Sequence, residues 1–179
     1  MRQVDDATEG VEELPLGDRV SWGSEVLADG AYTYVYGTEA AGRMKFAHVA
    51  RVRGTDLGGP WEFWTGSGWS PRMAESARVL SGVGTNYGVR RVGDRYVLVT
   101  HENNLLFSAD FVAYTADSPT GPFTGPQYLF RAPETDAGHI VYDADLHTEL
   151  ARPGKLLVSY NVNNLDDRVA VTTVVNKES

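Results

Sequence analysis

Three short polar stretches recur along this chain, and each stands in a predicted β-strand that should be the innermost of its sheet. They are residues 22–25 (Trp-Gly-Ser-Glu), 86–88 (Asn-Tyr-Gly) and 142–147 (Tyr-Asp-Ala-Asp-Leu-His). Polar groups in a buried strand must find partners, which are each other, water, an ion or a ligand. The candidate functional residues are therefore sought in these stretches.

Glu25, Asp143 and Asp145 are the candidate catalytic residues. Glycoside hydrolysis needs one protonated and one ionised carboxyl group, and the separation of the two sets the stereochemical outcome. Asp143 and Asp145 are two positions apart, so a regular strand would present both on one face. The same aspartates could instead hold sugar hydroxyls, bind calcium or cap a turn. Glu25 could equally be a salt-bridged strand residue.

Other side chains in or near these stretches could bind a sugar. Flat aromatic rings stack on the apolar faces of sugars, which makes Trp22 and Tyr87 candidate platforms. His147 has the parity of the two aspartates, so we expect all three to point inward together. Asparagines could donate hydrogen bonds to hydroxyls, although turn capping explains Asn161 equally well. The candidate substrate-binding residues are Trp22, Asn86, Tyr87, His147 and Asn161.

A long repeat must position these side chains. The stretch from Ala28 to Tyr36 recurs at residues 92–100, with Tyr32 and Tyr96 standing 64 residues apart, and its opening recurs at residues 152–160. Self-similarity at a fixed period indicates stacked or radially arranged units.

Within each unit, alternation of period two predicts short antiparallel strands, and a glycine-containing turn precedes each tyrosine-rich strand. The predicted strands cover residues 20–27, 32–36, 45–52, 62–65, 86–91, 96–99, 111–116, 128–131, 141–150, 156–160 and 168–175. No segment shows a convincing 3.6-residue apolar stripe, so little helix is expected. Trp61, Trp64 and Trp69 are expected to wedge between adjacent units. The sequence therefore predicts an all-β protein, a β-propeller of four-stranded antiparallel blades.

The repeat gives about three blades, which we interpret as part of a five-bladed propeller. The expected blades are residues 19–72, 73–135 and 136–179, after an N-terminal segment, residues 1–18, that is either a tail or a closing strand. We expect the chain to be the C-terminal part of a longer propeller. Exposed blade edges then predict self-association, and a monodisperse monomer in light scattering would contradict this.

Composition excludes several classes of function. The net charge of −8 argues against a nucleic-acid partner, because no excess of Lys and Arg is available to displace counterions. The absence of cysteine excludes disulfides, thiolate nucleophiles and cysteine zinc sites. No apolar run approaches the roughly 18 residues of a membrane helix, and residues 1–5 do not lead into the apolar core of a signal peptide. No membrane partner is expected, and the compartment stays unknown.

Several segments resemble a bacterial domain-of-unknown-function family, family 4185, and its relatives. They are residues 21–24 (Ser-Trp-Gly-Ser), 34–37 (Tyr-Val-Tyr-Gly), 113–123 (Ala-Tyr-Thr-Ala-Asp-Ser-Pro-Thr-Gly-Pro-Phe) and 157–163 (Leu-Val-Ser-Tyr-Asn-Val-Asn). That family is similar to five-bladed propellers of the family 43, 32 and 117 glycoside hydrolase type. Some of its members are endo-acting arabinanases that cut D-arabinan. The resemblance runs from about residue 19 to the C-terminus.

The resemblance implies a hydrolase that acts on polymeric, arabinose-rich sugars outside the cell. Glu25 lies near the position of the catalytic acid in the related enzymes. Their first two blades supply catalytic aspartates, so part of the machinery would lie outside this chain. By the same resemblance, His147 matches a histidine at the centre of the channel and is the candidate ligand of a central calcium ion.

Two alternatives remain open. One is a non-catalytic propeller that binds carbohydrate or protein through the same channel, and the other is an inactive fragment. A raised pKa on one member of a close carboxylate pair would favour the hydrolase. A pocket of aromatics and asparagines without such a pair would favour the binding module.

Overall fold

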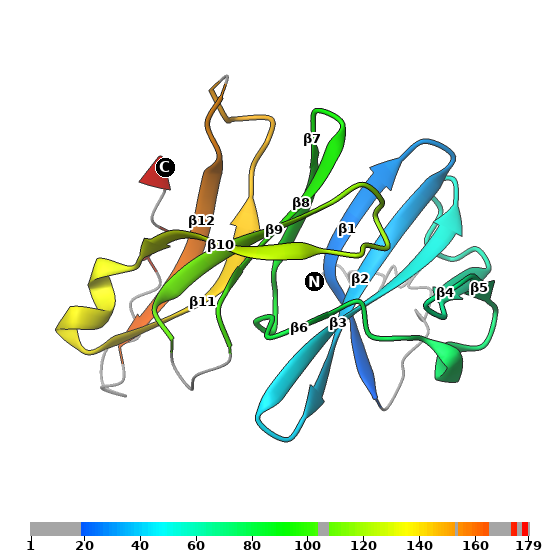
Figure 1. The fold of residues 1–179 in the computed structure, drawn as a ribbon, viewed down its shortest axis with the longest axis horizontal. Helices are drawn as coiled ribbons and strands as arrows, with labels where there is room; N and C mark the ends of the chain where they lie inside the picture. Colours follow the sequence, from blue (N-terminus) through cyan, green and yellow to red (C-terminus); the bar gives the residue numbers. More distant parts are fainter. Residues whose placement is uncertain (1–18, 104–107, 153, 165–172, 175–176, 179) are drawn as a thin grey trace, which may run out of the picture.

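A computed structural model describes most of the chain and shows three antiparallel sheets (Figure 1). The described residues are 19–103, 108–152, 154–164, 173–174 and 177–178. Within these ranges there is no α-helix, and the helical turns are the 3-10 segments Met73–Glu75 and Pro133–Ala137. The predicted all-β fold is confirmed for this part of the chain.

The first sheet is a meander of long hairpins. Its strands are β1 (Val20–Asp29), β2 (Tyr32–Ala41), β3 (Met44–Arg53), β4 (Trp61–Trp64) and β5 (Trp69–Ser70), in that order, and β6 (Leu80–Ser81) pairs with β3. Tight turns join β1 to β2 and β2 to β3. The sheet thus extends beyond residue 72, where the repeat placed the end of the first blade.

The second sheet is a four-stranded meander of the predicted kind. Its strands are β7 (Gly88–Val92), β8 (Arg95–His101), β9 (Asp110–Ala116) and β10 (Thr124–Arg131), in the order β10-β9-β8-β7. The β8–β9 pair has a regular register from Tyr96 opposite Ala116 to His101 opposite Phe111.

The third sheet begins with a two-stranded hairpin. Its strands are β11 (His139–Leu146), β12 (Leu157–Asn164), β13 (Thr173–Val174) and β14 (Lys177–Glu178), and both β13 and β14 pair with β12. Strand β11 ends at Leu146, earlier than the expected end at residue 150. The expected strand at residues 168–175 is described only at β13, and residues 1–18 lie outside the described part.

The three sheets follow one another across the molecule in chain order, as consecutive propeller blades do (Figure 1). Strand β1 contacts β7, and β7 contacts β11, so the first strand of each sheet lies beside the first strand of the next. The predicted arrangement, with the three polar stretches on neighbouring strands, therefore holds.

Apolar side chains fill the space between successive sheets. Tyr36, Val49, Tyr87 and Leu98 belong to the cluster that joins the first sheet to the second. A further cluster joins the second sheet to the third. Burial of these faces provides the main stabilisation of the blade order, since apolar burial contributes roughly 25 cal/mol per Å².

The tryptophans after the Gly-Pro turn do not share one environment. Trp64 packs against the cluster between the first two sheets. The ring of Trp69 lies against the ring of Trp64, with centroids 5.3 Å apart. Trp61 instead belongs to a third cluster, with Val35 and Phe63. The expected wedge between blades therefore fits Trp64 but not Trp61.

Close contact between the inner strands can be tested at Gly88 in β7. A Cβ atom at this position would lie 2.6 Å from the backbone nitrogen of Leu146 and 3.0 Å from a carboxylate oxygen of Asp145. We expect Gly88→Ala to lower the free energy of unfolding by about 1–3 kcal/mol, as overpacking does. Urea denaturation measures this. The control is Gly68→Ala, where nothing lies within 4 Å, and equal stability of the two variants would contradict the packing described.

Candidate functional site

Residues from all three polar stretches line one hollow of about 410 Å³ where the inner strands meet. Its lining residues are Gly23, Ser24, Glu25, Asn86, Tyr87, Asp143, Ala144, Asp145, Ser159 and Asn161. Of two other hollows in the described part of the chain, the one beside Trp61 and Phe63 has no titratable side chain in its lining, and the one beside Arg91 and Lys155 has no carboxyl group. The first hollow is therefore the candidate site.

Two β-bulges shape the wall of the hollow. The register of β1 on β2 shifts between Trp22 and Glu25, where Gly23 has φ 100°. The register of β11 on β12 shifts between Tyr142 and Asp145, where Asp143 has φ 54°. Bulges re-aim side chains and are common beside functional sites. Asp143 holds a left-handed conformation without being glycine, which marks it as a constrained position.

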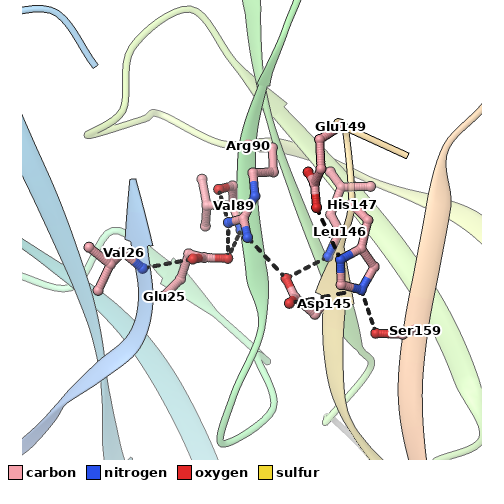
Figure 2. A network of polar contacts seen from close by, with 9 residues as sticks. All are labelled: Glu25, Val26, Val89, Arg90, Asp145, Leu146, His147, Glu149 and Ser159. Atoms are coloured by element: carbon pink, nitrogen blue, oxygen red, sulfur yellow. Dashed lines mark hydrogen bonds and ion pairs between the residues drawn. The ribbon is translucent and has the colours of Figure 1, made fainter. Parts of the chain in front are cut away.

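Glu25 and Asp145 share one arginine, which sequence reasoning missed (Figure 2). The guanidinium of Arg90 forms an ion pair with Glu25, and its second terminal nitrogen lies 3.5 Å from Oδ1 of Asp145. The Glu25 side chain is 10% exposed and that of Asp145 is 42% exposed. The two carboxylates thus face the same cation from the first and third blades. Glu25 is nearly buried, and Asp145 is partly exposed to solvent.

The surroundings of Glu25 raise its pKa above the usual value. Burial is the largest cause, and the negative charge of Asp145 acts in the same direction. The charge of Arg90 and the hydrogen bond donated by the backbone N–H of Val26, at 2.7 Å, oppose the rise. A carboxyl group whose pKa is raised in this way can hold a proton to donate.

Asp143 is held by two amides. Asn86 donates a hydrogen bond from Nδ2 to one carboxylate oxygen of Asp143 at 2.9 Å, and Asn161 donates to the other at 3.2 Å. Asn161 lies inside β12 and not in a turn, so the turn-capping explanation does not apply. Residues from β11, β12 and the segment before β7 therefore form one polar cluster in the hollow.

Neither expected aromatic platform is available for stacking. Tyr87 is 1% exposed, belongs to the cluster between the first two sheets and donates its hydroxyl hydrogen bond to the carbonyl of Gly37 at 2.8 Å. Trp22 stands before the bulge and packs on Phe63, with ring centroids 5.3 Å apart, instead of lining the hollow. Its place at the head of an inner strand had suggested a position beside the channel.

His147 lies beside Asp145 rather than in line with both aspartates. Its Nε2 is 2.7 Å from Oγ of Ser159 and 4.0 Å from Oδ2 of Asp145, and its Nδ1 is 3.6 Å from Glu149 (Figure 2). The order Ser159, His147, Glu149 is that of an acyl-transfer triad. The nearby charge of Asp145 would oppose the oxyanion that such chemistry forms, so we interpret His147 and Ser159 as neighbours that orient Asp145.

The expected calcium site does not fit the geometry. Both oxygens of Asp143 accept amide hydrogen bonds, and His147 faces Ser159 and Glu149. Across the described ranges, no group of three or more His, Asp or Glu side chains is arranged to hold a metal ion.

His101 is a second group near the hollow that was not among the predicted site residues. It ends β8, is 8% exposed, and its Nδ1 finds no hydrogen-bond partner among the described residues. Burial lowers its pKa to about 4, the charge of Lys45 adds to the effect, and that of Asp143 opposes it. Its signal in the sequence was the last inward position of a buried strand. For Arg90 the signal was its parity with Asn86 and Gly88.

Residues 2–176 match a family described only as a domain of unknown function, DUF5005. The chain belongs to the DUF5005 family. The match is to this family and not to family 4185, so the expected membership of family 4185 is not confirmed. The coarser expectation, a likeness to family 43 propellers, is supported by solved structures. No curated protein matches this DUF5005 chain.

Three solved structures show the same fold. A Bacteroides ovatus ATCC 8483 protein described as a hydrolase is similar with a TM-score of 0.65 and 22% identity, over 83% of this chain and 39% of that one. A thermostable family-43 glycoside hydrolase has a TM-score of 0.57 and 19% identity, over 92% and 50% of the two chains. An exo-β-1,3-galactanase from Clostridium thermocellum has a TM-score of 0.52 and 17% identity, over 84% and 35%.

These likenesses establish the fold as that of a β-propeller of the family 43 type. The DUF5005 chain spans at most half the length of these three structures. Among its described residues, no helix combines the length and the apolar character that crossing a membrane requires.

The buried His101 predicts an acid-sensitive fold. The unfolded chain takes up a proton near pH 6.5, whereas the folded chain does so only near pH 4, so stability is lost as the pH falls through this window. Urea unfolding between pH 8 and pH 4 measures the loss. His101→Gln, which cannot gain the proton, should show a smaller loss, and a slope equal to that of the wild type would contradict this account.

Proposed function

We propose that this DUF5005 chain contributes the wall of a glycoside hydrolase site, with Glu25 as general acid and Asp145 as the ionised partner. The observation that carries the proposal is that the two carboxylates, on different blades, share the single cation of Arg90. Hydrolysis of a glycosidic bond needs such a pair in two protonation states.

The roles follow from the surroundings of each group. Glu25 is the drier carboxyl, and its raised pKa suits a residue that protonates the leaving oxygen. Asp145 is more exposed, and its Oδ1 accepts the N–H of Leu146 at 2.7 Å, so the carboxyl group is held in place for the role of base or nucleophile.

The remaining polar groups fit the recognition of sugar hydroxyls. Asn86, Asp143 and Asn161 present amide and carboxylate groups in the same hollow. Such groups can exchange their mutual hydrogen bonds for bonds to a ligand at little net cost.

The substrate class we propose is a polymeric neutral sugar. The Clostridium thermocellum neighbour is an exo-β-1,3-galactanase, which supports a galactan, and the resemblance to family 4185 supports an arabinan. Because the chain spans only part of each neighbour's length, the proposal concerns the share of the site that these three blades supply.

A carbohydrate-binding module without hydrolysis is the second candidate. It is favoured by the amide-held Asp143, which needs no proton transfer to bind a hydroxyl. The two candidates differ in the fate of the sugar and not in its contacts.

Incubation with galactan, arabinan and xylan oligosaccharides, with products separated by anion-exchange chromatography and binding measured by calorimetry, tests the proposal. We expect Glu25→Gln to lower the hydrolysis rate by about 10²- to 10⁴-fold while oligosaccharide binding persists. The control is Glu62→Gln, which removes a carboxylate paired with Arg51 outside the hollow and should leave the rate unchanged.

Two outcomes would contradict the hydrolase. Binding of an oligosaccharide that stays intact would select the binding module. Hydrolysis that survives in Glu25→Gln would remove Glu25 from the chemistry.

A further inference from the structure

We propose that Arg90 is the positioning residue of this site: its guanidinium holds Glu25 and Asp145 together, and its single positive charge limits the tendency of the buried Glu25 to take up a proton. The inference rests on the proposed function and deepens it. Arg90 itself lies outside the lining of the hollow and acts through the two carboxylates.

The three residues come from the inner strands of three blades. Glu25 lies on β1, Arg90 on β7 and Asp145 on β11, and Figure 2 shows the guanidinium between the two carboxylates. The Arg90 side chain is 22% exposed and also donates to the carbonyl of Val89 at 3.0 Å. A planar guanidinium has several donors in a fixed fork, so one side chain can serve two acceptors at once.

The local charge is unbalanced while both carboxylates are ionised. Arg90 supplies one positive charge against the two carboxylates, and the neighbouring charged or titratable groups are Asp143, His147 and Glu149. Since a single cation offsets one anion, uptake of one proton restores neutrality in a site where charge is poorly solvated.

The two carboxylates differ in how well their surroundings solvate a negative charge. Asp145 is 42% exposed, accepts the N–H of Leu146 and lies beside His147. Glu25 is 10% exposed, so its charge is the more costly one to keep. Glu25 is therefore the carboxyl group that takes up a proton, and its ion pair with Arg90 opposes that uptake.

A salt bridge that served only as a charge would make a different prediction. Loss of the charge in Arg90→Met shifts the Glu25 titration in either case, but an arginine needed only for its charge could be replaced by lysine with no shift. A positioning arginine sets their titration, and lysine can replace only its charge, because an ammonium group cannot reproduce the fork.

The test is a ¹³C NMR titration of the Glu25 carboxyl carbon in the wild type and in Arg90→Met. Removal of the positive charge should raise the Glu25 titration midpoint by about one pH unit or more, since a nearby opposite charge lowers a carboxyl pKa by about 1–3 units. Arg90→Lys should give a smaller rise. The control, Arg91→Met, removes the next arginine of β7, which pairs with Asp29 at 3.0 Å, and should leave Glu25 unchanged.

An unchanged Glu25 midpoint in folded Arg90→Met would overturn the proposal, and if that variant does not fold, an unchanged midpoint in Arg90→Lys would do so. The pH profile of oligosaccharide hydrolysis adds an independent readout: its alkaline limb should move to higher pH in Arg90→Lys. A wild type that cleaves no sugar, together with a shifted Glu25 midpoint in Arg90→Met, would defeat the hydrolase and retain the role of Arg90. Cleavage by the wild type, together with an unshifted Glu25 midpoint in Arg90→Met, would retain the hydrolase and defeat the role of Arg90.

Discussion

The pairing of two carboxylates with one half-buried arginine is the interaction on which the rest of the site depends. Glu25 and Asp145 belong to sheets that are separated by the second blade, and Arg90 is the side chain of that blade that reaches both. The arrangement is possible because Gly88 lets β7 approach β11 closely. Burial of apolar faces holds the blades in their order. The charge cluster of Glu25, Arg90 and Asp145 then places the ionisable groups of the candidate site where the inner strands meet.

The bulges in β1 and β11 explain why polar residues can sit on inner strands without disrupting the sheets. The bulges add residues opposite their partner strands, two in β1 and one in β11, and this turns side chains toward the hollow that a regular strand would present elsewhere. The left-handed conformation of Asp143 is the local cost of this arrangement, and two amide hydrogen bonds stabilise it.

The sequence predicted the sheets well because strand alternation and turn signals are local properties. The polar stretches at residues 22–25, 86–88 and 142–147 meet in one hollow, as the repeat indicated. His147 lies elsewhere than expected, since period-two reasoning assumes a regular strand and His147 follows a bulge. Trp22 packs on Phe63 and not beside the channel. Arg90 was missed because its partners lie on other blades, and only the packed structure brings charges so distant in sequence together.

The measurement that tests most directly whether the first and third blades meet at one site is the pKa of the Glu25 carboxyl group in the Asp145→Asn variant. The amide of this variant would keep the shape and one acceptor oxygen of the aspartate but remove its charge, which is one cause of the raised pKa of Glu25. The account predicts a lower Glu25 pKa in this variant than in the wild type. An identical Glu25 pKa in the two proteins would show that the first and third blades do not meet at a common site.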